Sequence, residues 1–132
     1  MRIDHVAIAV KDLDDALAFY RDALGLEVTG RREVPAEGVE IAFLPTADTE
    51  IELISPLDPE NSIGRFLEKR GEGIHHLCVG VEDIEAAVAQ LQDEGARVLS
   101  EIKRHADGTR YVFIHPKSTH GVLMELYQKP EA

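Results

Sequence analysis

The sequence opens with a stretch that returns in the second half of the chain. Residues 5–10, His5-Val6-Ala7-Ile8-Ala9-Val10, correspond to residues 76–81, His76-Leu77-Cys78-Val79-Gly80-Val81, at an offset of 71 residues. Each copy begins with histidine and continues with apolar or small residues. A fixed offset of this kind indicates that one structural unit is used twice, so the chain should fold as two related modules.

The correspondence continues beyond the two histidine stretches. At the same offset Asp12 matches Asp83, Leu13 matches Ile84, Ala16 matches Ala87, Leu17 matches Val88, Tyr20 matches Leu91 and Pro45 matches Pro116. Each copy also closes on an apolar stretch with a single carboxylate, Glu52 in Ile51-Glu52-Leu53-Ile54 and Glu125 in Leu123-Met124-Glu125-Leu126. Two histidines and two glutamates therefore recur at equivalent positions.

Each copy has the periodicity of strand, helix, strand, strand, strand. Alternating and β-branched runs predict strands, while apolar residues at helical spacing after Asp12 and Asp83, with Gly25 and Gly95 behind them, predict one capped helix per copy. The expected strands are 3–10, 26–34, 39–44 and 49–54 in the first copy and 74–81, 97–102, 109–115 and 122–127 in the second. The linker 55–61 is rich in turn-forming residues, and we expect Ser62 to cap a short helix that ends near Arg70.

The chain should form one α+β domain of 132 residues, built from tandem βαβββ modules at about 1–55 and 73–128. Its formal net charge of -11 opposes nonspecific nucleic-acid binding. No apolar run approaches the roughly 20 residues that a membrane span needs. The start has no signal-peptide pattern, and Cys78 is the single cysteine, so we expect a cytoplasmic protein.

The four recurring residues have the chemistry of a metal site. Imidazole nitrogens and carboxylate oxygens bind divalent transition metals, and two carboxylates balance a 2+ charge. When two copies pack about a pseudo-twofold axis, equivalent positions can converge on one point. We therefore expect His5, Glu52, His76 and Glu125 to bind one divalent ion with coordination positions left open.

Two neighbouring residues compete with this ligand set. His75 and His76 are adjacent in a strand, so they point to opposite faces, and the repeat selects His76 because His75 aligns with Asp4. Cys78 shares the parity of His76, but it matches Ala7 and is expected to be a small packed residue. His105, His115 and His120 lie near turns and are expected to be structural or solvated.

On these residues the chain resembles the vicinal oxygen chelate superfamily. Within it, the chain is most similar to the methylmalonyl-CoA epimerases, through Ile3-Asp4-His5-Val6-Ala7, Glu52-Leu53-Ile54-Ser55-Pro56-Leu57, His75-His76, and His115-Pro116-Lys117-Ser118 followed by Gly121-Val122-Leu123-Met124-Glu125-Leu126. The resemblance implies a cupped mixed sheet around a central metal, with His5, Glu52, His76 and Glu125 as ligands of Co, Mn, Zn or Ni. Some epimerases have glutamine at the position of Glu52.

The resemblance also implies a reaction. A 2-carboxyacyl-CoA thioester, methylmalonyl-CoA, would be epimerised through an enolate stabilised by the metal, with two carboxylates as acid and base. These carboxylates would be Glu125 and Glu40, with Glu37 as the substitute because the Pro35 turn varies in length. We expect the phosphates of CoA to be bound by Lys103, Arg104 and Lys117, and the protein to be a homodimer.

Three other functions fit the same pattern less well. Lactoylglutathione lyase resembles the chain and uses a similar pair of histidines and pair of glutamates, so ligand type does not separate the two reactions. A metal-free small-molecule-binding protein of this fold has less need of four ligand residues. The ring-cleaving dioxygenases that resemble this superfamily use two histidines and one glutamate, and this chain is too short and too rich in carboxylate ligands for them.

Overall fold

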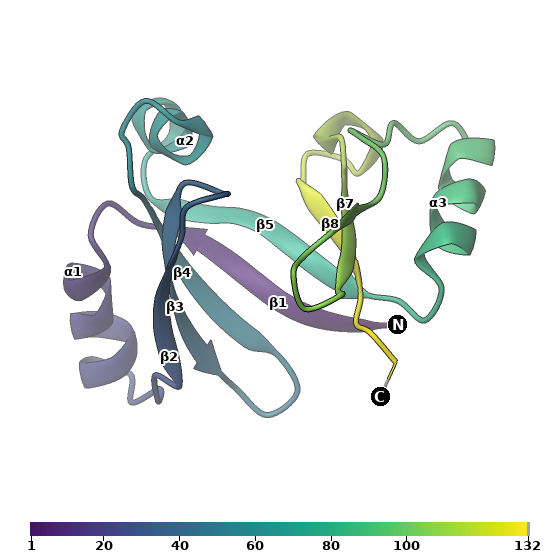
Figure 1. Ribbon diagram of the computed structural model, residues 1–132. Coiled ribbons are helices and arrows are strands. Elements are labelled where there is room, and N and C mark those ends of the chain that lie inside the picture. Colours follow the sequence, from purple (N-terminus) through teal and green to yellow (C-terminus); the bar gives the residue numbers. More distant parts are fainter. Residues whose placement is uncertain (132) are drawn as a thin grey trace. The chain divides into compact units, whose positions relative to one another are not determined.

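The computed structural model describes residues 1–131, and these residues divide into two compact units (Figure 1). The N-terminal unit comprises His5–His75, and the C-terminal unit comprises residues 1–4 together with 76–131. Residues 1–4, at the start of strand β1 (Arg2–Ala9), belong to the C-terminal unit, and residues 73–75, at the start of β5 (Gly73–Gly80), belong to the N-terminal unit. Each unit contains one copy of the βαβββ order, so the predicted α+β class and module order are confirmed.

The strands of the N-terminal unit have the order β2-β3-β4-β1. Strands β2 (Gly30–Val34), β3 (Val39–Pro45) and β4 (Glu50–Pro56) pair antiparallel with one another, and β1 pairs parallel with β4. Residues that face each other across a ladder share one face of the sheet. The register therefore fixes which side chains lie together.

One face of these strands packs against helix α1 (Leu13–Leu17), which continues as a π-helical segment over Ala18–Ala23. The helix begins where Asp12 accepts a hydrogen bond from the Asp15 amide at 3.0 Å, as its position after the strand predicts. It buries apolar side chains against β3 and β4, and this core consists of Val10, Leu13, Leu17, Ala42, Leu44 and Leu53. This face is called the helix face below.

The opposite face carries His5 and is called the histidine face. Helix α2 (Ser62–Arg70) packs on it, and the core between them consists of Ala7, Ala9, Val39, Ile41, Ile54, Ile63 and Leu67. The cap of α2 is Asn61, whose side chain accepts from the Gly64 amide at 2.9 Å, so the prediction of Ser62 as the cap was wrong by one residue. Asn61 also donates to the Gly38 carbonyl at 2.7 Å, which a serine side chain is too short to do at the same time.

The C-terminal unit repeats this plan. Its strands have the order β5-β8-β7-β6, with β6 at Lys103–Arg104, β7 at Arg110–Ile114 and β8 at Met124–Gln128. Helix α3 (Ile84–Asp93) begins at Asp83, which accepts from the Ala86 amide at 3.1 Å. The helix packs on one face of the strands, and this core consists of Ile84, Val112, Ile114 and Leu126. A short 3-10 helix follows β7 at Pro116–Ser118.

Two predicted strands are shorter than expected. Residues 26–29 precede β2 without joining it, although Leu26 and Val28 pack on the helix face. Residues 97–102 form only an isolated bridge between Val98 and Ile114, and the regular pairing of this segment begins at Lys103. In both segments the apolar residues pack on a helix core without a continuous ladder, so apolar content alone overpredicted strand length.

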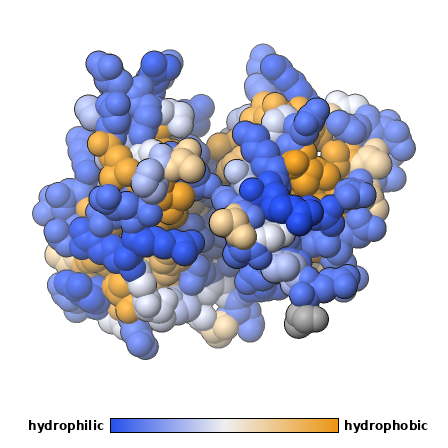
Figure 2. Space-filling view, in the orientation of Figure 1, coloured by the Kyte–Doolittle hydropathy of each residue, from blue (hydrophilic) through white to orange (hydrophobic). Residues whose placement is uncertain are grey.

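The visible surface is largely hydrophilic, with small apolar patches (Figure 2), in keeping with 25 acidic and 14 basic residues. None of the helices within residues 1–131 is long and apolar enough to cross a membrane.

Candidate metal and active site

In the N-terminal unit, His5 and Glu52 lie against each other. His5 Nδ1 is 3.3 Å from Glu52 Oε2, and the two side chains are only 4% and 14% exposed. The parallel ladder explains this contact, because Ala7 is paired with Glu52, so that Glu52 shares the face of Ala7 and His5. The small alanine leaves space beside the strand for the two larger polar groups.

In the C-terminal unit, His76 and Glu125 form the corresponding contact. His76 Nε2 is 3.2 Å from Glu125 Oε1, with 11% and 6% of the side chains exposed. Glu125 is paired with Cys78 on β5 and with Phe113 on β7, and the Phe113 ring lies edge to face with His76 at 5.3 Å between centroids. The two units thus present the same pair of side chains at repeat-related positions.

Each pair fits a divalent metal. An imidazole nitrogen and a carboxylate oxygen are typical ligands of Zn²⁺ and its neighbours, and two ligand atoms bound at about 2.0–2.1 Å to one ion lie roughly 3 Å apart. The separations of 3.3 and 3.2 Å match that spacing. Burial also fits, because a carboxylate removed from water needs a partner that carries positive charge or donates hydrogen bonds.

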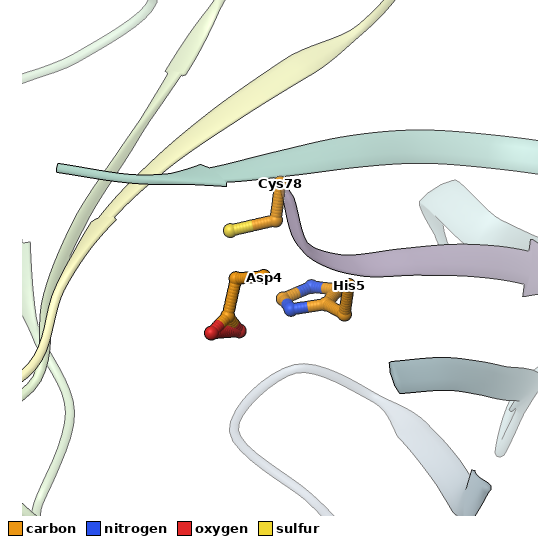
Figure 3. Close-up of side chains that lie close together, drawn as sticks. All are labelled: Asp4, His5 and Cys78. Carbon is orange, nitrogen blue, oxygen red and sulfur yellow. The ribbon is translucent and has the colours of Figure 1, made fainter. Parts of the chain in front are cut away.

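The residues that competed for the ligand set are placed differently. The His75 ring packs edge to face against Phe66 of α2, at 5.0 Å between centroids, in the N-terminal unit. Cys78 is completely buried on β5, in the unit that also holds Asp4, and Figure 3 draws both side chains. Asp4 is itself mostly buried, and Arg2 and Lys129 lie 3.6 and 3.4 Å from its carboxylate.

Glu40 lies on the helix face, whereas Glu52 lies on the histidine face. In the β3–β4 register Glu40 is paired with Ser55, and Phe43 is paired with Glu52. Glu40 and Phe43 are an odd number of positions apart in β3, so their side chains point to opposite faces, and Glu40 lies on the face opposite to Glu52. Its carboxylate accepts two hydrogen bonds from Arg31, at 3.0 and 3.3 Å. The same arginine donates to Asp14 of α1 at 2.6 Å, which places the whole group on the helix face. The structure thus places Glu40 in a link between β3 and α1, and its role as the acid–base partner of Glu125 stays a prediction.

In the group of Arg31, Glu40 and Asp14, the opposite charges favour the charged forms of Arg31 and Asp14. Hydrogen bonds to Glu40 and Asp14 raise the pKa of the Arg31 guanidinium above its ordinary value, and the hydrogen bond from Arg31 lowers the pKa of Asp14. Glu40 is thus part of a link between helix and sheet. Glu37, the predicted substitute, is exposed in the turn between β2 and β3.

The three residues of the predicted basic patch, Lys103, Arg104 and Lys117, do not share one face of the strands. Lys103 is paired with Tyr111, which shares the face of Phe113 and Glu125, whereas Arg104 is paired with Arg110 on the opposite face. Arg110 donates to Glu85 of α3 at 2.6 Å, which confirms that its face is the one covered by the helix. Lys117 is exposed in the 3-10 helix after β7. The structure therefore does not bring Lys103 and Arg104 together.

Arg32 is a basic residue that sequence reasoning missed. It is paired with Ile41, so it lies on the histidine face of the N-terminal unit, and its guanidinium sits over the Phe43 ring at 5.1 Å from the centroid. No carboxylate among residues 1–131 forms an ion pair with it, in contrast to its neighbour Arg31. Side chains alternate along a strand, so the sequence already places Arg31 and Arg32 on opposite faces of β2. It does not tell which of the two faces carries the site.

Comparison with known proteins places this site in context. The chain is 48% identical, over 96% of its length and 97% of the relative's, to the ethylmalonyl-CoA/methylmalonyl-CoA epimerase of Cereibacter sphaeroides. It is 43% identical to the human mitochondrial methylmalonyl-CoA epimerase, over 96% of this chain and 73% of the human protein. A variant of the Streptomyces coelicolor methylmalonyl-CoA epimerase, solved in complex with 2-nitronate-propionyl-CoA, superposes with a TM-score of 0.88 at 38% identity and covers 99% of both chains.

A family model matches residues 4–113, which include β1, β4 and β5 with His5, Glu52 and His76. The match, the repeated βαβββ order and the two histidine–glutamate pairs lead to the same conclusion. The chain belongs to the glyoxalase/bleomycin resistance protein/dioxygenase superfamily.

Proposed function

We propose that this chain epimerises (R)- and (S)-methylmalonyl-CoA in a metal-dependent reaction. The observation that carries the proposal is the pair of equivalent histidine–glutamate contacts at 3.3 and 3.2 Å, in a chain that aligns over nearly its whole length with methylmalonyl-CoA epimerases. Epimerisation removes the hydrogen between the thioester carbonyl and the free carboxylate, then returns a proton to the other side of the same carbon. The site must therefore supply electrophilic assistance and proton transfer.

His5, Glu52, His76 and Glu125 would hold one divalent ion. Each pair joins an imidazole nitrogen, Nδ1 of His5 or Nε2 of His76, to a glutamate oxygen at a similar separation. The repeat relates the two pairs, which supports a shared ion over two separate ones. When bound, the ion would supply Lewis-acid stabilisation of the negative charge that develops on the substrate oxygens. Co, Mn, Zn and Ni all accept this donor set.

Glu125 would move a proton at its carboxylate. It is buried on β8 beside His76, and the side chains around it on the same face include Phe113 and Cys78. A carboxylate held at the reacting carbon can take a proton from it and return one, as general acid–base catalysis requires. The aromatic and sulfur-containing neighbours would also exclude water from the reacting carbon.

The substrate carries phosphates and a carboxylate, which need positive charge in an acidic protein. Arg32 and Lys103 would supply it, because each lies on the same face as the histidine–glutamate pair of its own unit. Arg32 is held over Phe43 and has no carboxylate partner among the described residues, so its guanidinium would bind an anion without first losing an ion pair. Lys117 is a further cation for the nucleotide portion, and Arg104 is not proposed.

An assay on metal-stripped and metal-restored protein tests the proposal. The purified chain is incubated with one epimer of methylmalonyl-CoA in deuterated water, and both the epimer ratio and the deuterium at carbon 2 are measured. We expect inversion with incorporation of solvent deuterium in the restored protein and a large loss in the stripped protein. The hemithioacetal of glutathione and methylglyoxal is tested in parallel. Turnover of the hemithioacetal alone would favour a lactoylglutathione lyase and overturn the proposal.

A further inference from the structure

Aromatic side chains lie beside Glu125 on the strands of the C-terminal unit. The β7–β8 ladder pairs Phe113 with Glu125 and Tyr111 with Tyr127, and residues two positions apart in a strand share a face. Phe113, Tyr111 and Tyr127 therefore lie on the same face as Glu125. The Phe113 ring is edge to face with the His76 ring at 5.3 Å and with the Tyr111 ring at 6.5 Å between centroids.

Of the two residues paired directly with Glu125, only Phe113 has surface that a ligand can reach. On one side of Glu125 the paired residue is Cys78 of β5, which is completely buried. On the other side it is Phe113 of β7, which is half-buried, so part of its ring stays open. Directly opposite residues of an antiparallel ladder have Cβ atoms about 4.5–5.5 Å apart. A group that reaches the Glu125 carboxylate therefore comes next to the Phe113 ring.

Carbon 2 of the substrate carries four groups with different requirements. Its hydrogen must face the Glu125 carboxylate for proton transfer. Its free carboxylate and its thioester carbonyl are polar and need hydrogen-bond donors or cations. The fourth group is an alkyl chain, which gains free energy when it leaves water for a hydrocarbon surface. With carbon 2 beside Glu125, the Phe113 ring is the surface that suits this chain.

We propose that Phe113 contacts the alkyl group on carbon 2 and limits its length, an inference that rests on the proposed epimerase function. The substrates are then CoA thioesters of malonic acids with a short 2-alkyl chain. The ring is held by His76 and Tyr111, at distances typical of edge-to-face aromatic pairs. A longer alkyl chain has to push the ring out of these two contacts, so Phe113 acts as a wall of fixed position.

The test measures kcat/KM for the methyl, ethyl and propyl members of the 2-alkylmalonyl-CoA series. Each metal-loaded protein receives each substrate in deuterated water, and the epimer ratio and the deuterium at carbon 2 are followed. Phe113→Leu and Phe113→Val reduce the side chain progressively and keep it apolar. Val112→Ala is the matched control, because Val112 is the adjacent residue of β7 and packs against the core of α3 on the opposite face.

The decisive quantity is kcat/KM for propylmalonyl-CoA divided by kcat/KM for methylmalonyl-CoA. Both values come from the same preparation, so a loss of folded or metal-loaded molecules cancels. A disturbance of His76, which Phe113 also contacts, lowers both values alike. We expect the ratio to rise by about tenfold or more in Phe113→Val and by less in Phe113→Leu, because one methylene group in an apolar pocket changes specificity by about 10–200-fold. Val112→Ala should keep the ratio of the unsubstituted protein.

Three results would overturn the proposal. The first is equal kcat/KM for all three substrates in the unsubstituted protein, and the second is an unchanged ratio in both Phe113 variants. The third is an equal rise of the ratio in Val112→Ala, which would assign the effect to a loosened strand. Absence of methylmalonyl-CoA epimerisation by the unsubstituted, metal-loaded protein would instead refute the proposed function, so the two failures are distinguishable.

Discussion

Arg31 donates two hydrogen bonds to Glu40, from Nε to Oε2 at 3.0 Å and from Nη2 to Oε1 at 3.3 Å. Its remaining nitrogen, Nη1, donates to Asp14 of α1 at 2.6 Å. One guanidinium therefore joins β2, β3 and the first turn of α1. In the C-terminal unit Arg110 plays a similar part, because it donates to Glu85, the repeat equivalent of Asp14, and to Gln128 of β8.

Replacing Arg31 should weaken the fold without removing the chemistry. Arg31→Gln leaves Glu40 and Asp14 without their shared cation, so we expect a lower urea midpoint of unfolding but epimerase activity per folded molecule close to that of the unsubstituted protein. Arg32→Gln is the matched control, since its guanidinium contacts an aromatic ring and no carboxylate among the described residues. Equal midpoints for the two variants would contradict the structural role of Arg31.

The Asp14 contact also predicts a dependence of stability on pH. The hydrogen bond from Arg31 lowers the pKa of Asp14 in the folded state from its ordinary value of 3.8. A carboxyl group whose pKa is lower in the folded state stabilises the fold above its unfolded pKa, and this contribution disappears as the pH falls through the folded pKa. The difference in free energy of unfolding between the unsubstituted protein and Asp14→Asn should therefore be constant near neutral pH and shrink below 3.8. Urea titrations at a series of pH values measure it, and a difference that grew on acidification would have the wrong sign.

The sequence predicted the two histidine–glutamate pairs but not the faces of the strands between them. The repeat at His5 and His76 fixed two positions, and the lone carboxylate of each closing strand fixed the other two. The face of Glu40 could not be predicted because β3 is apolar on both faces, so alternation alone does not tell which side carries the site. The register with β4, which pairs Phe43 with Glu52, was needed to decide. It depends on the length of the turn between Pro45 and Glu50, which the pattern of apolar residues does not reveal.

Local context accounts for the remaining differences. Asn61 was overlooked as the cap of α2 because Ser62 is an equally good capping residue, and the choice depends on the contact with Gly38, 23 residues away in sequence. Lys103 and Arg104 are adjacent in sequence, and adjacency was taken as proximity, although consecutive residues of a strand point to opposite faces.

Metal binding should appear as thermal stabilisation. If the four proposed ligands bind one ion, excess metal should raise the melting temperature and a chelator should lower it, because a ligand at about 100 times its dissociation constant adds roughly 2.7 kcal/mol. His76→Ala and His5→Ala should both lose most of this response. His75→Ala is the control, since His75 packs against Phe66. A full response in His76→Ala would refute the ligand assignment.

The faces on which the basic residues lie predict which of them bind substrate anions. Arg32 and Lys103 share a face with the histidine–glutamate pair of their own unit, and Arg104 does not. Arg32→Gln and Lys103→Gln should each raise the KM for methylmalonyl-CoA by about fivefold, the equivalent of roughly 1 kcal/mol for an exposed charge contact. Arg104→Gln should leave it unchanged, because Arg104 is paired with Arg110 on the other face. A thioester of methylmalonate with N-acetylcysteamine retains the carboxylate but has no phosphates. An effect that persists with this substrate would assign the contact to the carboxylate, and no effect of Arg32→Gln or Lys103→Gln with either substrate would refute the assignment.

The start of α2 depends on a glycine that has no room for a side chain. A Cβ built on Gly64 would lie 2.1 Å from the Pro59 carbonyl oxygen, a backbone atom that cannot rotate away. The Gly64 amide is also the donor to the Asn61 cap, so relief of the clash would disturb the first turn. Through Ile63 and Leu67 this helix covers the core of the histidine face. Gly64→Ala should therefore cost about 1–3 kcal/mol, the range for overpacking, and lower the melting temperature by several degrees.

Gly73→Ala provides the matched control for this prediction. Gly73 has no described atom within 4 Å of its built Cβ, and its φ is not in the left-handed region. Alanine there reduces the freedom of the unfolded chain, so stability should be unchanged or rise by about 0.4–1 kcal/mol. Because α2 packs beside the strands that carry His5 and Glu52, Gly64→Ala should also weaken metal binding, measured by calorimetric titration. Equal stability of the two variants would show that α2 can shift to accommodate a methyl group, and that its close contact with Pro59 does not hold the histidine face in place.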